Sequence, residues 1–246
     1  PAAPSAAAPA AAAAKPPPLS GELKPFTRMQ AVVARRMVES KTQVPHIYLT
    51  ISIDMAAAMK FRADSNEFLG KESGLSVNDL FIKAVALTLR RHPDLNASYR
   101  ENGIQYNAEI NVGFAVSLPG GLVVPVIRNA DQRSLPQIAA EARTLANKAR
   151  TTGLALADYE GGTFSTSNLG MLGVEEFDAV VNPPQAGILA IGAITEEPVV
   201  RGGQIVVGQK CRVTLSCDHR VVYGWTAGEF LRDLKGLLER PLALVY

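Results

Sequence analysis

Apolar side chains recur at helical spacing in four stretches of this 246-residue chain. Thr27 suits the N-cap of a first helix over residues 27–41, and Ser76 with Asp79 matches a capping box that opens a second helix ending near His92. Ser134 caps an Ala-rich third helix that ends before Gly153. A last helix is predicted over about residues 225–239, before Pro241.

Alternating apolar and polar residues predict strands between these helices. Residues 46–54 alternate, and residues 110–118 and 122–127 indicate two strands joined by a Pro-Gly-Gly turn. Four short β-rich pieces follow at 163–167, 188–193, 205–207 and 211–217. Because strands and helices are interspersed without a regular βαβ repeat, the pattern predicts an α+β two-layer sandwich, a mixed sheet with helices packed on one side.

The first 18 residues contain ten Ala and six Pro and have no large side chain to bury. Prolines at this density interrupt a helix, so the stretch is expected to be a semi-extended linker. The sequence therefore predicts a linker over residues 1–22 and one domain over 23–246. A chain that opens inside a linker is expected to be part of a longer protein.

Composition excludes several classes of function. The formal net charge is +2 with both signs mixed along the chain, which gives no basic patch for nucleic acid or an anionic membrane. Two cysteines do not make a disulfide framework, and the three histidines have no metal-ligand spacing. No apolar run is long enough to span a bilayer, and the N-terminus does not resemble a signal peptide.

Two segments carry candidate chemistry. In residues 216–224 a β-rich run delivers His219 to its end, where a histidine can act as a general base; a hydrogen-bonded structural histidine is the alternative. In residues 161–173 a hydroxyl-rich strand enters a Gly-containing turn, and Ser167 with Asn168 could stabilise an oxyanion; an ordinary strand and turn is the alternative.

A Cys217–His219 nucleophile pair is a rival interpretation, since both residues fall on one face of a strand. A small buried cysteine that fills the core is favoured over it. His46 and His92 are both interpreted as structural, the latter at a helix carbonyl end. Asp218 alternates to the face opposite His219 and is not expected to orient its imidazole.

Several blocks, in the same order, resemble the dihydrolipoamide acyltransferase components of 2-oxo acid dehydrogenase complexes. Residues 219–224 match the signature His-x-x-x-Asp-Gly at every fixed position except Tyr223, and the hydroxyl-bearing turn matches residues 167–170. Similar blocks lie at 25–37, 92–97, 121–127 and 182–186, so the resemblance covers nearly all of the chain after the linker. The family shares its fold with chloramphenicol acetyltransferase, which is therefore the fold that the resemblance implies.

The resemblance also implies an activity, the transfer of an acyl group between coenzyme A and a dihydrolipoyl thiol. It assigns His219 the role of base and Ser167 that of oxyanion stabiliser, with substrate contacts from Asn168, Leu169 and Gly170. The sequences of residues 163–173 and 177–180 most resemble those of the pyruvate dehydrogenase members, which favours acetyl as the transferred acyl group. Coenzyme A is then a substrate, the lipoyl group belongs to a separate upstream domain, and no metal is needed.

The implied assembly is a homotrimer with each site between adjacent subunits, built further into a cage of 24 or 60 chains. The implied partners are the pyruvate dehydrogenase and dihydrolipoamide dehydrogenase components and lipoyl domains, in bacterial cytoplasm, plastid stroma or mitochondrial matrix. The apolar tail 242–246 is then expected to dock into a neighbour, so that its deletion leaves trimers that cannot form the large particle.

Tyr223 stands where the family motif usually has Asp. The resemblance makes that Asp a structural partner and His219 the base, so Tyr223 is interpreted as a tolerated change. It also motivates a second hypothesis, a non-catalytic core subunit that serves as a scaffold. An acyl-transfer assay separates these two hypotheses. A third hypothesis is a hydrolase that uses Cys217 and His219; replacing Cys217 should abolish that activity but spare acyl transfer.

Overall fold

The computed structural model describes residues 21–70, 73–118 and 121–245. The linker expected over residues 1–22 lies almost entirely outside them, as does most of the turn expected at 119–121. Five α-helices form in the described chain: α1 (Arg28–Gln43), α2 (Ala56–Leu69), α3 (Val77–Leu89), α4 (Leu135–Thr151) and α5 (Gly224–Glu239). Short 3₁₀ turns add η1 (Pro93–Asn96), η2 (Leu156–Asp158), η3 (Gly170–Leu172) and η4 (Pro241–Leu244).

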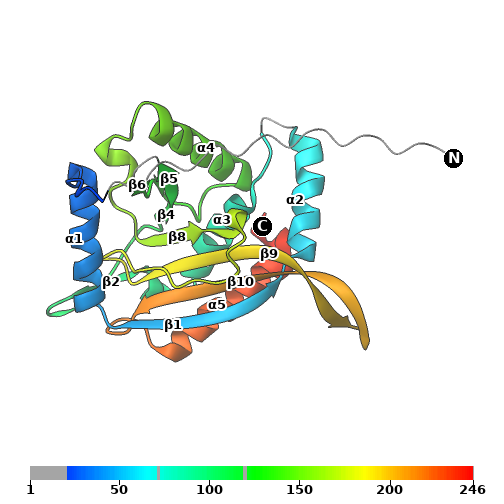
Figure 1. Ribbon diagram of the computed structural model, residues 1–246. Helices are drawn as coiled ribbons and strands as arrows, with labels where there is room; N and C mark the ends of the chain where they lie inside the picture. The colour runs from blue at the N-terminus through cyan, green and yellow to red at the C-terminus, as the bar shows by residue number, and fades with distance from the viewer. Residues whose placement is uncertain (1–20, 71–72, 119–120, 246) are drawn as a thin grey trace.

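One six-stranded mixed sheet carries the fold (Figure 1). Its strand order is β1 (His46–Asp54), β10 (Gln204–Asp218), β9 (Gly187–Arg201), β8 (Phe164–Asn168), β4 (Val112–Phe114) and β7 (Val126–Ile127). Strand β8 runs parallel to both β9 and β4, and the other pairs are antiparallel. The predicted mixed sheet is confirmed.

Helices α3 and α5 pack against each other on the core side of this sheet, where α5 lies along β1 and β10. Ten of the 13 residues of α3 are buried, which explains why its sequence is apolar on almost every side. Helix α4 contacts α3, and α2 lies against α5. The core thus occupies the layer between sheet and helices, as expected for a two-layer sandwich.

Three helix starts follow the local capping chemistry. The hydroxyls of Thr27, Ser76 and Ser134 each accept a hydrogen bond from the third residue of the helix, whose side chain accepts one in return. Helix α3 ends at Leu89, three residues earlier than predicted. Helix α2 and a hairpin of β2 (Ala97–Arg100) and β3 (Gly103–Tyr106) were not predicted.

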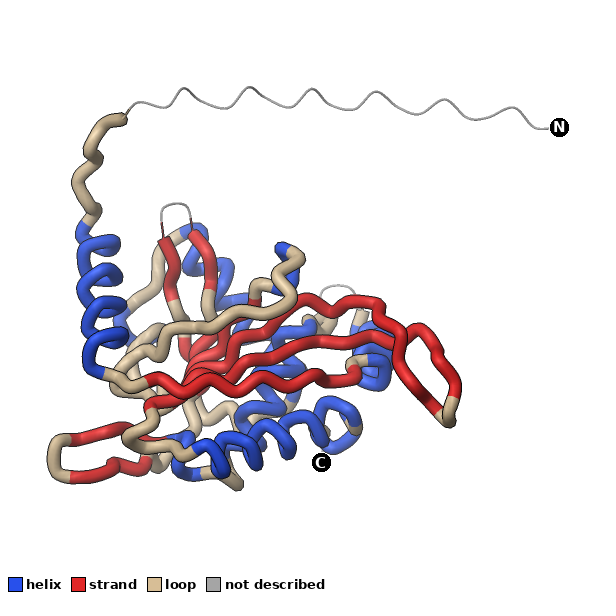
Figure 2. The backbone as a smooth tube through the Cα atoms, turned by 60° about the horizontal axis from the view of Figure 1, so that its bottom comes forward, coloured by secondary structure: helices blue, strands red, loops and turns tan. Residues whose placement is uncertain are grey.

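Of the four short β-rich pieces, 163–167 is confirmed as the short strand β8, one residue further along. The piece 188–193 belongs to the longer β9, and the last two are parts of β10. Strands β9 and β10 form one hairpin of 15 residues each, closed by Gly202 and Gly203, whose positive φ angles of 56° and 79° suit a tight turn. Its outer end extends beyond the helical layer as a two-stranded ribbon (Figure 2). Because that ribbon has no core to face, its alternation is weak in the sequence, and the prediction of short pieces was wrong for β9 and β10.

The face of the sheet away from the helices is covered in part by residues 174–186. A small apolar cluster forms there from Phe177, Ala179, Val181, Ile188 and Ala190. Val181 is held on both sides, because its carbonyl accepts from Ser40 at 2.6 Å and its N–H donates to His46 Nε2 at 3.1 Å. This covering segment therefore joins α1, β1 and β9.

The C-terminal tail is ordered by its own chain up to residue 245. Leu244 in η4 is 2% exposed and belongs to the main core, whereas Leu242 is 66% exposed. The turn contacts α2, α3 and α5. Residues 241–245 thus pack against their own chain, and in the described part of the tail the exposed Leu242 and Val245 remain free for a neighbour.

Candidate active site

His219 follows the last residue of β10 and begins the turn that leads into α5. Its backbone N–H donates to the carbonyl of Pro45 at 2.9 Å, which ties the turn to the start of β1. The side chain is exposed, and among the described residues its imidazole forms no hydrogen bond. The expected exposed histidine at a strand end is therefore present, with both ring nitrogens free in a single chain.

Asp218 and Arg220, which flank His219, bind each other. Asp218 is buried and accepts hydrogen bonds from Arg220 Nε at 2.9 Å and Nη2 at 2.7 Å, and from the Arg220 backbone N–H at 3.0 Å. The guanidinium of Arg220 also lies 3.9 Å from the ring centroid of Tyr99 in β2. The hydrogen bond and charge of Asp218 raise the pKa of Arg220.

This Asp218–Arg220–Tyr99 clamp connects the histidine turn to the β2–β3 hairpin. Sequence reasoning correctly kept Asp218 away from the imidazole but missed Arg220 and Tyr99. The available signal was an Asp and an Arg two positions apart around the histidine, a spacing that allows the bidentate pair. The aromatic partner comes from a hairpin that local patterns did not predict.

Tyr223 is the N-cap residue of α5 and is 65% exposed. Its ring centroid lies 6.0 Å from that of His219, with the two ring planes at 70°, an edge-to-face arrangement. Trp225, in the first turn of the helix, is also exposed. In a single chain the imidazole of His219 and the aromatic side chains of Tyr223 and Trp225 are therefore exposed at this turn.

Ser167 and Asn168 end strand β8, which is separated from β10 by strand β9. Ser167 is half-buried, and its hydroxyl has no hydrogen-bond partner among the described residues. Asn168 Oδ1 accepts from the Gly170 N–H at 2.9 Å, so this side chain shapes the turn and keeps only its amide nitrogen available. A Cβ on Gly170 would lie 2.5 Å from the carbonyl oxygen of Gly192, which requires glycine at this position.

Strand register separates Ser167 from His219 within one chain. Ser167 is level with Ala190 of β9, and Ala190 is level with Thr214 of β10. His219 lies five residues beyond Thr214, or about 16 Å along the strand direction at the rise per residue of a β-strand. The hydroxyl and the imidazole are thus separated along the strand direction, and β9 also lies between β8 and β10, so one described chain does not bring them together.

The remaining cysteines and histidines have structural roles. Cys217 and Cys211 are buried in the core, and burial raises the pKa of both thiols, that of Cys211 to about 12. His46 is held between Val44 and Val181, which confirms it as structural. His92 pairs with Asp233 at 3.0 Å, so its partner is a carboxylate of α5, while its backbone N–H bonds the end of α3.

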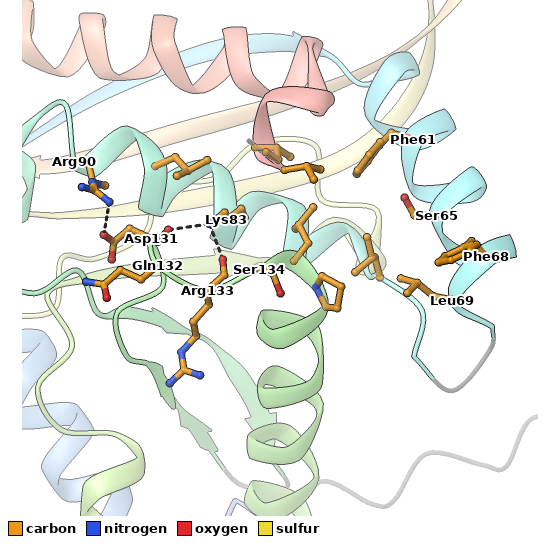
Figure 3. A pocket seen from close by; sticks show the side chains of 16 residues that line it. Phe61, Ser65, Phe68, Leu69, Lys83, Arg90, Asp131, Gln132, Arg133 and Ser134 are labelled. Atoms are coloured by element: carbon orange, nitrogen blue, oxygen red, sulfur yellow. Dashed lines mark hydrogen bonds and ion pairs between the residues drawn. The ribbon is translucent and has the colours of Figure 1, made fainter.

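A cavity of about 620 Å³ is lined by none of these candidate residues. Figure 3 shows the side chains that line it. The cavity lies between α2, α3, the start of α4 and the C-terminal tail. Lys83 closes its polar end through bonds to the carbonyls of Asp131 at 2.9 Å and Arg133 at 2.6 Å. Among the described residues no His, Cys, Asp and Glu cluster could hold a metal ion, and no helix is long and apolar enough to cross a membrane.

Relatives of known identity match the chain over most of its length. The dihydrolipoyllysine-residue acetyltransferase component of the pyruvate dehydrogenase complex of Rhizobium meliloti is 42% identical over 233 residues, covering 93% of this chain and 52% of that protein. The mitochondrial dihydrolipoyllysine-residue acetyltransferase component 2 of the pyruvate dehydrogenase complex of Arabidopsis thaliana is 44% identical over 227 residues. The match covers 90% of this chain and 42% of that protein. The chain therefore spans about half the length of the curated relatives it matches.

Solved structures agree in fold. The dihydrolipoamide acetyltransferase of Azotobacter vinelandii superimposes with a TM-score of 0.88 at 34% identity, covering 94% of this chain and 98% of that one. The cubic core of a pyruvate dehydrogenase multienzyme complex gives a TM-score of 0.88 at 35% identity, covering 94% of this chain and 98% of that one. Chloramphenicol acetyltransferase gives 0.53 at 12% identity, covering 83% and 94%, which confirms the fold expected from the sequence.

The family model for the catalytic domain of 2-oxoacid dehydrogenase acyltransferases matches residues 19–246. This match covers the sheet, the histidine turn and the serine strand together. The chain belongs to the family of 2-oxoacid dehydrogenase acyltransferase catalytic domains.

Proposed function

We propose that this chain transfers an acetyl group between coenzyme A and the thiol of a dihydrolipoyl group carried on another domain. The observation that carries the proposal is the free Ser167 hydroxyl and the free His219 imidazole, two reactive groups without partners inside the described chain. Both occupy rigid positions, one at a strand end and the other on a turn that the clamp holds.

The Azotobacter vinelandii structure supports these two residues. It was determined to investigate the role of a serine, a histidine and an asparagine in the catalytic mechanism of that enzyme. There the histidine follows the serine by 52 positions and precedes the asparagine by four. Ser167, His219 and Tyr223 have the same spacing here. The residue four positions after the histidine therefore differs between the two proteins and is not a carboxylate in either.

In the proposed reaction His219 is the base. A thiol is mostly protonated near neutral pH and is a poor nucleophile until its proton is removed. The neutral imidazole takes this proton as the sulfur attacks the thioester carbonyl carbon. When the tetrahedral intermediate collapses, the carbon–sulfur bond of the original thioester breaks, and His219 returns the proton to the departing thiolate.

Ser167 acts on the oxygen of the same intermediate. The carbonyl oxygen becomes negatively charged when the thiol adds, and the serine hydroxyl donates a hydrogen bond to it. A donor aimed at such an oxyanion contributes about 10²–10³ in rate, because its interaction is strongest in the transition state. Asn168, through its free amide nitrogen, and the backbone of Leu169 and Gly170 are the proposed further contacts to substrate.

The proposed site forms between two copies of the chain in a homotrimer. Two observations support this. Ser167 and His219 are too far apart to meet within one chain, and apolar side chains remain exposed on the surface of that chain. Met171 and Leu172 follow the serine strand, and Trp225 follows the histidine turn. Phe26, which precedes α1, and Met29, Val32 and Val33 on α1 are also exposed. A second copy that covers these surfaces would bring the serine of one chain to the histidine of the next.

A mixing experiment tests the shared site. Particles of His219→Ala and of Ser167→Ala are each expected to be inactive. After dissociation and reassembly of an equal mixture, about a quarter of wild-type activity should return. In randomly mixed cyclic trimers, about a quarter of the sites combine an intact His219 from one chain with an intact Ser167 from its neighbour. A mixture that stays inactive although mixed trimers have formed would contradict a site shared between chains.

Larger assembly and partners are proposed from the same relatives. The chain would form the core of a pyruvate dehydrogenase complex, as a cage of 24 or 60 chains, with pyruvate dehydrogenase and dihydrolipoamide dehydrogenase components bound to it. Lipoyl domains on a separate part of the full-length protein would deliver the thiol, through a linker that includes residues 1–22. The relatives named above are bacterial and mitochondrial, which supports cytoplasm or an organelle interior.

The first test is acetyl transfer from acetyl-CoA to free dihydrolipoamide, with succinyl-CoA and a branched-chain acyl-CoA as alternative donors. We expect the assembled chain to prefer the acetyl donor and His219→Ala to lose activity by at least about a hundredfold, the lower range for general base catalysis. Assembled particles without activity on any of the three donors would contradict the proposal and favour the scaffold hypothesis.

A further inference from the structure

Residue 223 occupies the N-cap position of α5, where a side chain has a defined task. Its φ and ψ angles of −89° and 157° are those of an N-cap, yet the Tyr223 side chain forms no capping hydrogen bond. Asp and Asn are among the best N-cap residues because their oxygens accept from the first free N–H groups of a helix. The Azotobacter vinelandii enzyme has Asn at this spacing. Tyrosine therefore leaves α5 without a side-chain cap that a common alternative would provide.

The contact that Tyr223 forms instead is with His219. The two rings are edge to face at 6.0 Å and 70°, and this is the one ring contact of the imidazole among the described residues. The backbone on both sides of His219 is held by Pro45 and by the clamp, but those bonds leave the χ angles of the side chain unrestrained. An aromatic ring at position 223 restricts them, because edge-to-face packing favours one ring orientation over the others.

We infer that Tyr223 is a positioning residue, whose ring holds the His219 imidazole in one orientation in place of capping α5. The inference rests on the proposed function for its catalytic consequence, but the ring contact itself does not. It explains why an aromatic residue is compatible with this motif, since a neutral ring can orient the base without adding charge beside it.

Charged groups around His219 are otherwise engaged. Asp218 and Arg220 bind each other, and the imidazole of His46, which faces Asp218 across the β1–β10 pair, is bonded to Val44 and Val181. Lys41, at the end of α1, bonds the hydroxyl of Tyr48. A carboxylate introduced at position 223 would thus be a new charge four residues from the base, and it would stabilise the protonated imidazole.

Four variants of the assembled chain separate positioning from capping and from chemistry: Tyr223→Phe, Tyr223→Leu, Tyr223→Asn and Tyr223→Asp. We expect Tyr223→Phe to retain most of kcat, and Tyr223→Leu to lose about three- to tenfold in kcat with little change in KM, the rate equivalent of one aromatic contact. Tyr223→Asn should show a similar loss in kcat but a higher melting temperature, because it restores the cap.

The Tyr223→Asp variant adds a pH readout. Since a carboxylate favours the charged imidazole, more alkaline solution is needed to form the base, and the acid limb of the pH–rate profile should move to higher pH. Tyr223→Phe and Tyr223→Leu should leave that limb in place. The shift would show that residue 223 lies close enough to His219 to act on its imidazole, and the comparison of Tyr223→Phe with Tyr223→Leu tests the positioning itself.

Crystal structures of the Tyr223→Leu and Tyr223→Phe particles give a readout that does not need activity. The imidazole of His219 should occupy more than one rotamer with Leu and a single rotamer with Phe. One unchanged rotamer in Tyr223→Leu, or a kcat of Tyr223→Phe as low as that of Tyr223→Leu, would overturn the inference. If the wild-type chain transfers no acyl group but the rotamers behave as expected, the proposed function fails and the positioning role stands.

Discussion

Asp218 and Arg220 bind each other across His219, through both side chains and one backbone N–H. The pair orients the turn without touching the imidazole, and Tyr99 covers the guanidinium from a separate hairpin. Because Asp218 is buried, its carboxylate depends on Arg220 for charge compensation. This pairing leads to a first prediction.

Replacing Arg220 by Gln should lower both stability and kcat. The buried carboxylate of Asp218 would lose its charged partner, and since Arg220 is itself 30% exposed, we expect a cost of about 2 kcal/mol rather than the value for a fully buried pair. Thermal unfolding at fixed protein concentration measures the change. Arg232→Gln is the matched control, because that side chain is 68% exposed and its ion pairs should contribute almost nothing. Equal effects of the two variants would contradict the clamp.

Ser167→Ala should reduce kcat by about 10²–10³ and leave KM nearly unchanged, because the hydroxyl acts on an oxyanion present only in the transition state. Steady-state acetyl transfer measures both constants. Ser117→Ala, on the exposed side of the β5 (Val116–Leu118) strand, removes an equivalent hydroxyl elsewhere and should behave as wild type. A loss below about threefold for Ser167→Ala would remove it from the proposed site.

Two kinds of leucine in the tail should respond differently. Leu244→Ala is expected to lower the free energy of unfolding by about 2–5 kcal/mol, because it leaves a cavity in the core of its own chain. Leu242→Ser combined with Val245→Ser removes exposed apolar surface and should instead release trimers from the large particle in sedimentation experiments. Deleting residues 242–246 combines both effects and is less informative. An intact large particle with both exposed residues replaced would contradict docking of the tail.

Both thiols should be unreactive in the folded protein. Burial raises the pKa of Cys211 to about 12 and also raises the pKa of Cys217, so almost no thiolate exists at pH 8. We expect Ellman's reagent to detect no thiol in the native particle and two per chain after unfolding. Cys217→Ala should retain acetyl transfer, whereas the rival Cys217–His219 hydrolase requires rapid labelling and loss of activity on substitution.

Local chemistry explains which elements could be predicted. The capping boxes at Ser76 and Ser134 involve atoms three residues apart, so the helix starts are legible in the sequence. The partner of His92 is Asp233, 141 residues away, and no local pattern contains that pairing. Helix α2 has only one buried residue, Ala58. Its apolar stripe is therefore weak, and the sequence pattern did not reveal the helix.

The sequence by itself determined the chemical groups of the candidate site and their immediate setting, a histidine at a strand end and a serine before a glycine turn. It also determined the starts of α1, α3 and α4, since each capping box depends on neighbours along the chain. Only the tertiary structure decided that Ser167 and His219 are too far apart to meet within one chain and that Arg220 stacks on Tyr99. Strand register and contacts between distant hairpins arise from the packing of the whole core, and that packing depends on every element at once.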